Sequence, residues 1–129
     1  MENSYLCPYC RGHLKVEKHI VFSVKTAAGA RGLLFLSPKL GDYHCINHET
    51  FELKEGERLD IFCAICHSNL KALSVNKNLA KVVMIDKNAN EYDVYFSEIV
   101  GEKCTYKIHE KDVESFGKNA AEYINFFGV

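Results

Sequence analysis

The sequence predicts an α+β fold in which antiparallel β-sheet is the main component. Two C-x-x-C motifs stand at residues 7–10 and 63–66. Several short segments alternate apolar and polar residues, which is typical of strands with one buried face. Only the segment from residue 113 to residue 127 has the three-and-four spacing of a helix face. We therefore expect a β-rich protein with one C-terminal helix.

Composition narrows the class of protein. The 129 residues are 47% hydrophobic and 26% charged, which is ordinary for a globular domain. Residues 1–70 carry eight Lys or Arg and eight Asp or Glu, and residues 71–129 carry eight and nine, so neither half is basic. No apolar run is long enough to span a membrane, and no signal-peptide pattern begins the sequence. We expect a cytoplasmic protein without a membrane partner, whose cysteines are metal ligands or free thiols.

The first cysteine motif reads as a tight metal-binding turn, or knuckle. Cys7 and Cys10 are separated by Pro8, which fixes φ directly after the first cysteine. Gly12 is expected to supply a positive φ, and Leu14 to pack against the turn.

Two hairpins are expected between the cysteine motifs. Residues 15–26 alternate Ile, Phe and Val with polar residues, and a Gly-containing connection leads to the apolar run 33–36. This pattern predicts a first hairpin over residues 16–36. Residues 51–54 and 58–62 flank the turn-forming residues 55–57, which predicts a second hairpin.

The second cysteine motif repeats the first over eight residues. Cys63 and Cys66 are followed by Leu70, at the spacing at which Leu14 follows Cys10. Ser68 stands in the position of Gly12. Its neighbour Asn69 tolerates the left-handed conformation, so it is expected to provide the turn.

The remainder of the chain predicts an antiparallel meander followed by a helix. Residues 79–86, 92–97 and 104–109 read as three strands that are separated by short polar turns. Five apolar residues then recur at helical spacing and predict a helix that covers the meander. They are Val113, Phe116, Ala120, Ile124 and Phe127.

The four motif cysteines together predict one structural Zn²⁺ site. Zinc prefers soft thiolate ligands in a tetrahedron, and two C-x-x-C turns supply four thiolates. The proposed metal ligands are Cys7, Cys10, Cys63 and Cys66. Iron is the alternative metal for such a ligand set.

A redox role for the CPYC motif at residues 7–10 is a weaker interpretation. This motif is found in glutaredoxins, where a strand precedes it and a long helix follows it. Here only six residues precede Cys7, and the β-branched segment 16–24 follows Cys10. The context therefore favours metal binding.

The two knuckles, Cys7–Leu14 and Cys63–Leu70, resemble those of the zinc-ribbon or rubredoxin-like class. Pro8 matches the Pro that follows the first cysteine in many members of that class, whereas Ala64 does not. Arg11 and His67 replace the Gly that often follows the second cysteine. The resemblance implies a small β scaffold stabilised by metal, which serves many unrelated roles.

A second group of reactive residues lies between the knuckles. Cys45 has His44 directly before it and His48 three positions after it. This combination offers an alternative function as a thiol enzyme or a second metal site, in which Cys45 or His48 could also replace a knuckle ligand. The simpler interpretation makes Cys45 a small buried residue.

These observations predict two modules, with a shared core as one arrangement of them. Residues 1–74 form a zinc-ribbon-like module with inserted hairpins, and residues 75–129 form a three-stranded meander with a C-terminal helix. Because catalytic signatures are absent, we expect a non-enzymatic protein-interaction or scaffold module whose partner is another protein. A nucleic-acid-binding zinc ribbon is the alternative, with Arg11, Lys15 and Lys18 as a local basic patch.

Overall fold

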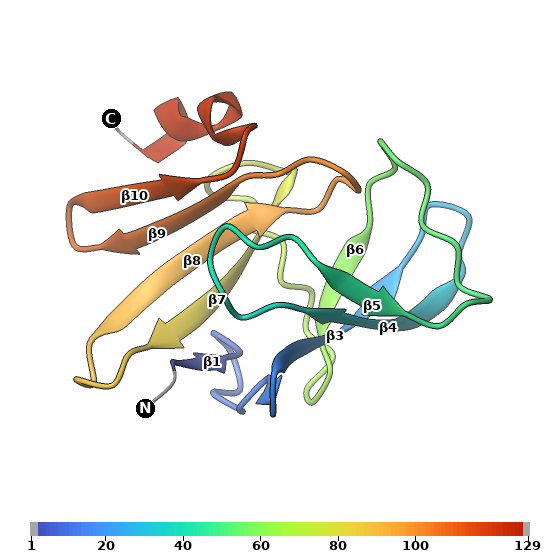
Figure 1. Ribbon diagram of the computed structural model, residues 1–129, viewed down its shortest axis with the longest axis horizontal. Coiled ribbons are helices and arrows are strands. Elements are labelled where there is room, and N and C mark those ends of the chain that lie inside the picture. The colour runs from blue at the N-terminus through green and yellow to red at the C-terminus, as the bar shows by residue number, and fades with distance from the viewer. Residues whose placement is uncertain (1–2, 128–129) are drawn as a thin grey trace.

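The computed structural model describes residues 3–127. Within them the chain forms ten β-strands and two short 3₁₀ helices, arranged as two antiparallel sheets (Figure 1). The strands are β1 (Ser4–Leu6), β2 (Lys15–Val16), β3 (His19–Lys25), β4 (Arg31–Leu36), β5 (Cys45–Asn47), β6 (Asp60–Cys63), β7 (Leu79–Ile85), β8 (Glu91–Ser97), β9 (Thr105–His109) and β10 (Asp112–Phe116). The helices are η1 (Ala120–Glu122) and η2 (Ile124–Phe127).

The strand order defines two sheets. Sheet A has the order β1-β7-β8-β9-β10. Sheet B has the order β2-β3-β4-β5, and β6 also pairs with β3. The inner faces of the two sheets pack on each other and form the main core. Phe22 and Phe96 meet there, with ring centroids 5.4 Å apart.

Successive side chains of a strand point to opposite faces of the sheet, and this alternation determines which of them enter the core. On β3 the side chains of Ile20, Phe22 and Val24 are buried, as the sequence pattern predicts. The first hairpin is also confirmed, because β3 pairs with β4 over six residue pairs. The meander formed by β7, β8 and β9 is likewise confirmed.

The chain contains an internal structural repeat that is longer than the eight-residue motif. The strand pairings of residues 19–47 recur sixty positions later, in residues 79–107. The pair Val21↔Phe35 in the first set is equivalent to Lys81↔Tyr95 in the second. The pair Phe35↔Ile46 is equivalent to Tyr95↔Tyr106. We call residues 4–47 the first repeat and residues 60–107 the second repeat.

The knuckles belong to the same repeat, but their equivalent residues are separated by fewer sequence positions. The Leu14 amide donates to the carbonyl of Tyr5, and fifty-six positions later the Leu70 amide donates to the carbonyl of Ile61. The connection that leads from the knuckle to the first meander strand is four residues longer in the second repeat. This insertion explains why equivalent residues are 56 positions apart in the knuckles and 60 positions apart in the strands that follow.

The two repeats exchange strands. Strand β1 precedes the first knuckle but pairs with β7 of the second repeat. Strand β6 precedes the second knuckle but pairs with β3 of the first repeat. The registers are again equivalent, because Tyr5 lies opposite Met84 and Ile61 lies opposite Val24. Each sheet therefore contains one strand from the other repeat.

The predicted C-terminal helix is wrong, and the fold is almost entirely antiparallel β-sheet rather than α+β. Residues 112–116 form strand β10, which pairs with β9, and only short 3₁₀ turns follow. Gly117 has a φ of 97°, which an α-helix cannot accommodate, so the chain turns sharply there. The apolar spacing resembles a helix by coincidence, since it joins residues of a strand to residues of the turns.

The predicted second hairpin is also wrong. Residues 51–54 are not a strand, and β6 pairs with β3 instead. The turn at residues 55–57 does form, with Gly56 at a φ of 87°. Its outgoing segment bonds to the loop after β8, where the amide of Leu59 donates to the carbonyl of Glu98.

No helix among residues 3–127 is long and apolar enough to cross a membrane.

Candidate metal centre

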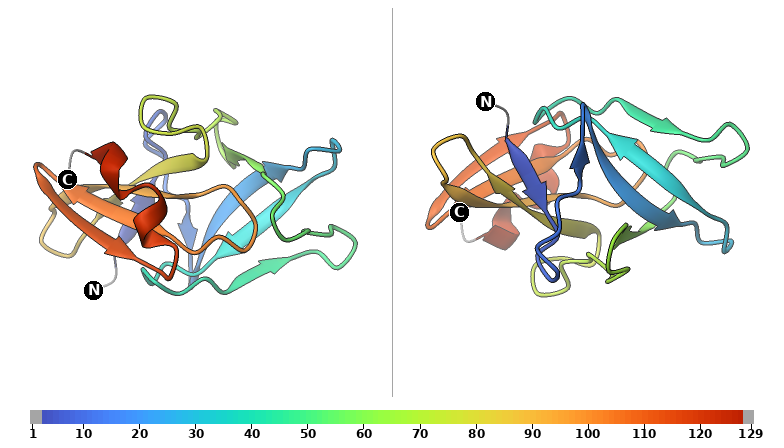
Figure 2. Two further views of the ribbon diagram at one scale, coloured as in Figure 1. Left: turned by 90° about the horizontal axis from the view of Figure 1, so that it is seen from above. Right: turned by 90° about the horizontal axis from the view of Figure 1, so that it is seen from below.

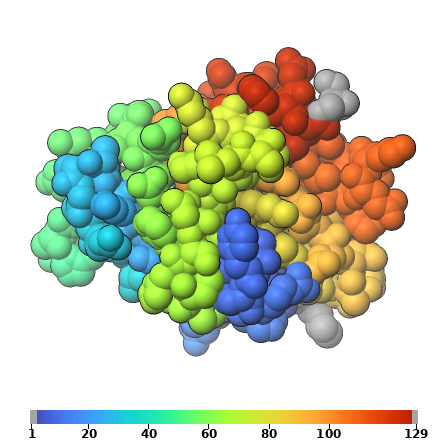
Figure 3. All heavy atoms as spheres, turned by 180° about the vertical axis from the view of Figure 1, so that it is seen from behind, coloured from blue at the N-terminus to red at the C-terminus, as the bar shows by residue number. Residues whose placement is uncertain are grey.

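The strand exchange brings the two knuckles together at the back of the molecule. In Figure 3 the N-terminal residues, in blue, lie directly against the yellow-green segment near residue 65. The Sγ atoms of Cys7 and Cys66 are 3.8 Å apart, as are those of Cys10 and Cys63. All four Sγ atoms lie within 4.8 Å of one another.

These separations fit a four-thiolate metal site. Four sulfurs at about 2.3 Å from a central zinc ion, in a tetrahedron, lie about 3.8 Å from one another. The sulfur pairs Cys7–Cys66 and Cys10–Cys63 have this separation. The cluster can therefore hold one metal ion with all four ligands supplied by protein.

In the first knuckle, backbone amides point at the sulfurs. The amides of Tyr9 and Cys10 lie 3.3 and 3.5 Å from Cys7 Sγ, and the amide of Gly12 lies 3.4 Å from Cys10 Sγ. The turn is closed by the Arg11 amide, which donates to the carbonyl of Cys7 at 3.0 Å. Such donors stabilise the negative charge of thiolates.

The second knuckle repeats this geometry. The amides of Ile65 and Cys66 lie 3.3 and 3.4 Å from Cys63 Sγ. The His67 amide donates to the carbonyl of Cys63 at 3.0 Å, and Ser68 Oγ lies 3.3 Å from Cys66 Sγ. The predicted equivalence of the two motifs therefore extends to their hydrogen bonds.

The residues that make the turns differ from those predicted. Arg11 has a φ of 60° and His67 a φ of 64°, so the left-handed residue directly follows the second cysteine in both knuckles. Gly12 and Asn69 were expected to take this conformation. Gly12 instead leaves room for the other knuckle, because a Cβ atom there would lie 2.6 Å from Ile65 Cδ1.

The cysteines have unequal environments. Cys7 and Cys63 are fully buried, whereas Cys10 and Cys66 are exposed. Burial raises the pKa of the Cys7 thiol to about 12. Hydrogen bonds from the side chain and backbone of Ser68 lower the pKa of Cys66 to about 6. A buried thiolate at Cys7 therefore needs a cation beside it, which a bound metal ion supplies.

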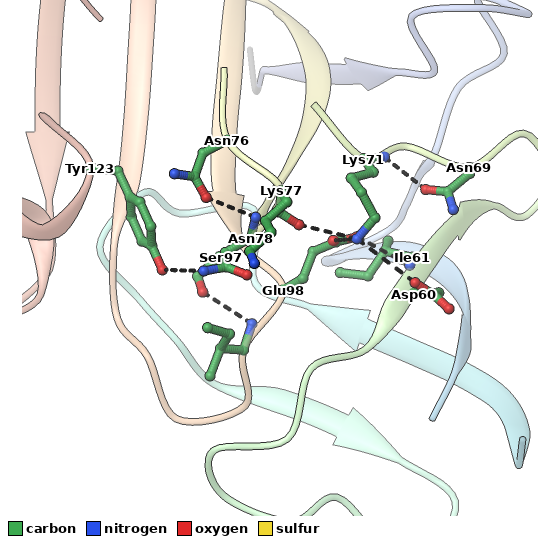
Figure 4. A network of polar contacts seen from close by, with 11 residues as sticks. Asp60, Ile61, Asn69, Lys71, Asn76, Lys77, Asn78, Ser97, Glu98 and Tyr123 are labelled. Carbon is green, nitrogen blue, oxygen red and sulfur yellow. Dashed lines mark hydrogen bonds and ion pairs between the residues drawn. The ribbon is translucent and has the colours of Figure 1, made fainter. Parts of the chain in front are cut away.

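A buried ion pair connects the second knuckle to the core (Figure 4). Glu98 is only 1% exposed, and its carboxylate lies 2.6 Å from Lys71 Nζ. The amide of Ile61 also donates to this carboxylate, at 3.3 Å. Burial raises the pKa of Glu98, and the bond from Lys71 opposes that rise. Sequence reasoning missed this pair, because Lys71 and Glu98 are 27 positions apart.

The alternative site around Cys45 is not assembled. Cys45 lies on β5 and is exposed rather than buried, and His44 and His48 are exposed as well. His48 Nδ1 lies 2.7 Å from Thr50 Oγ1. Within residues 3–127, the four knuckle cysteines are the one group of three or more His, Cys, Asp or Glu side chains placed to share a metal.

A cavity of about 190 Å³ lies between the sheets, lined mostly by apolar residues of both repeats. At its wall, the Tyr5 hydroxyl donates to the carbonyl of Pro38. Throughout the described part of the chain, every buried side-chain nitrogen or oxygen atom has a hydrogen-bond partner. The fully buried polar groups of the cavity wall are therefore already hydrogen-bonded.

Comparisons with protein families, with curated proteins and with solved structures gave no match. The chemistry of the cysteine cluster and the shape of the fold are therefore the basis for assigning a function.

Proposed function

We propose that this chain is a zinc protein with one structural site, and that it acts as a non-enzymatic protein-interaction or scaffold module. The zinc ligands are Cys7, Cys10, Cys63 and Cys66. The observation that carries the proposal is the 3.8 Å separation of the facing sulfur pairs, which is the edge of a zinc–thiolate tetrahedron.

Four protein ligands favour a structural role. Catalytic zinc keeps one position open for water or substrate, whereas structural zinc is enclosed by four side chains. The cysteine cluster fills all four positions. No step of catalysis is therefore assigned to the metal.

The zinc would hold together the two places where the repeats exchange strands. The first knuckle follows β1, which lies in sheet A, and the second follows β6, which lies in sheet B. A metal bound between the knuckles links both sheets at this point. Metal binding of this kind contributes directly to the free energy of folding.

Chelation tests this role. Treatment of the reduced protein with a strong zinc chelator should abolish the native circular dichroism spectrum, and added Zn²⁺ should restore it. A protein that released zinc and kept its melting temperature would contradict the structural role.

The nucleic-acid alternative has less support. The net charge is −1, and Arg11 of the expected basic patch already forms a 2.6 Å ion pair with Glu91. Binding to random-sequence DNA or RNA, measured at several salt concentrations, separates the two functions. Tight binding that weakens steeply with salt would support the alternative.

A further inference from the structure

The second repeat has a cover that the first repeat lacks. Strand β10 pairs along the outer edge of β9, and η1 and η2 then lie across the outer face of sheet A. Tyr106 is fully buried beneath them, and Phe127 lies over it with ring centroids 4.7 Å apart. Tyr95 also contacts Phe127, at 5.1 Å. Residues 112–127 thus complete the second repeat, and we call them the cover segment.

The equivalent surface of the first repeat is open. Phe35 and Ile46 occupy the positions of Tyr95 and Tyr106, and they lie side by side on the outer face of sheet B. Ile46 is 47% exposed and its neighbour on this face, Leu33, is 51% exposed. Strand β5 is the edge of its sheet, where β9 has β10. Figures 1 and 2 show the red C-terminal turns against β9 and β10, far from β3 and β4.

Charge at one end of this surface indicates what it binds. Lys25 and Arg31 lie opposite each other at the end of the β3–β4 hairpin, on the same face as Leu33; Asp60 lies opposite Lys25 on its other side, so this end has one net positive charge. Neither forms an ion pair with another residue in the described range. The cover segment of the second repeat carries three acidic residues and one lysine. A segment of similar chemistry would therefore complement this end of the surface.

We propose that the outer face of sheet B and the free edge of β5 bind a peptide segment of a partner protein. The segment would add a strand to β5 and lay two aromatic side chains, four positions apart, over Phe35 and Ile46. It would also carry acidic residues toward Lys25 and Arg31. The proposal rests on the protein-interaction role proposed above and gives that role a surface and a class of partner.

A peptide copy of the cover segment tests this proposal. A fluorescein-labelled peptide of residues 112–127 is titrated with the zinc-loaded full chain, and fluorescence anisotropy is recorded. We expect saturable binding that Ile46→Lys weakens at least tenfold. The matched variant Leu73→Lys changes an equally apolar side chain outside this surface, 74% exposed, and should alter the affinity less than twofold.

Further variants make the result unambiguous. If Ile46→Lys disturbs the fold, Leu33→Lys on the same face replaces it. A peptide with both Tyr123 and Phe127 changed to Ala should lose binding. The absence of saturable binding, or binding that Ile46→Lys leaves unchanged, would overturn the proposal. So would sedimentation data showing a dimer that Ile46→Lys dissociates, because a second copy would then occupy the face.

Zinc content is measured on the same samples. A zinc-loaded, folded protein that does not bind the peptide contradicts the docking surface alone. A protein without zinc contradicts the metal site, whatever the anisotropy shows.

Discussion

The residue after the second cysteine of each knuckle has a left-handed backbone conformation, although neither residue is glycine. Arg11 and His67 both have a φ near 60°. Residues with a Cβ atom adopt this conformation at a cost of about 1–2 kcal/mol. The knuckle geometry is therefore supported by the amide–sulfur bonds and by the metal ion that we propose, and not by an easily deformed glycine turn.

Replacing His67 with Gly should relieve this strain. Since Gly also raises the conformational entropy of the unfolded chain, we expect a net stabilisation of about 0.5 kcal/mol. His67→Ala keeps the Cβ atom and should leave stability unchanged. The melting temperature of the zinc-loaded protein measures both, and a clear loss of stability in His67→Gly would show that the turn is not strained.

Acid should weaken zinc binding, because each thiol must lose its proton to become a ligand. Burial raises the pKa of Cys7 to about 12, so this thiol is protonated in the metal-free protein at neutral pH and must release its proton to zinc. The apparent affinity should therefore fall at least tenfold for each pH unit between pH 8 and pH 6. Competition with a coloured chelator measures it, and a flat profile would contradict the assignment of Cys7.

At the scale of elements, the pair of Lys71 and Glu98 joins the second knuckle to the end of β8. Removing one partner of a buried ion pair leaves an unpaired charge and costs about 3–5 kcal/mol. We expect Lys71→Met to destabilise the protein by this amount in denaturant unfolding. The double variant with Glu98→Met should recover most of the loss, and equal destabilisation of both variants would indicate that packing, not charge, is responsible.

Gly117 marks the corner between β10 and the C-terminal turns. A Cβ atom there would lie 2.3 Å from the Lys103 carbonyl oxygen, at a φ of 97°. Gly29 has a similar φ of 93° but open space around it. Gly29→Ala should therefore cost about 1 kcal/mol through backbone strain alone.

Gly117→Ala should cost at least 2 kcal/mol more and expose the aromatic residues beneath the turns. Denaturant unfolding and tyrosine fluorescence measure the two effects. Equal losses for the two substitutions would contradict the account of this corner.

Strands could be predicted from the sequence wherever one face is buried, as in β3, where Ile, Phe and Val alternate with polar residues. The absence of a C-terminal helix could not be predicted from such a pattern. Val113 and Phe116 have a helical spacing to Ile124, and the close approach of the Lys103 carbonyl to Gly117 joins residues that are distant in sequence. Pairing of β6 with β3 was similarly invisible, because it joins segments about forty residues apart.

At the scale of the whole molecule, the fold is a repeat whose halves exchange their first strands. The sequence shows this only at the knuckles, where Cys7 and Cys10 recur as Cys63 and Cys66. On the inner faces of the sheets, equivalent positions keep burial but not identity; Phe22, for example, corresponds to Val82. The clustering of the four cysteines could be predicted because metal-ligand chemistry permits few substitutions, whereas the strand exchange depends on apolar packing that many residues satisfy.

The strand exchange predicts that both sheets unfold together. Since β1 and β6 each lie in the sheet of the other repeat, neither sheet is complete alone. Far-ultraviolet circular dichroism and tyrosine fluorescence should give one coincident transition in urea. Two separate transitions would show that residues 1–74 and 75–129 fold as independent modules.

The metal content of protein purified under reducing conditions shows whether the four cysteines bind zinc. We predict one zinc ion per chain, lost in Cys63→Ser and retained in the matched variant Cys45→Ser. Elemental analysis that found no zinc, or iron in its place, would contradict the claim. So would a Cys63→Ser protein that kept both its zinc and its melting temperature.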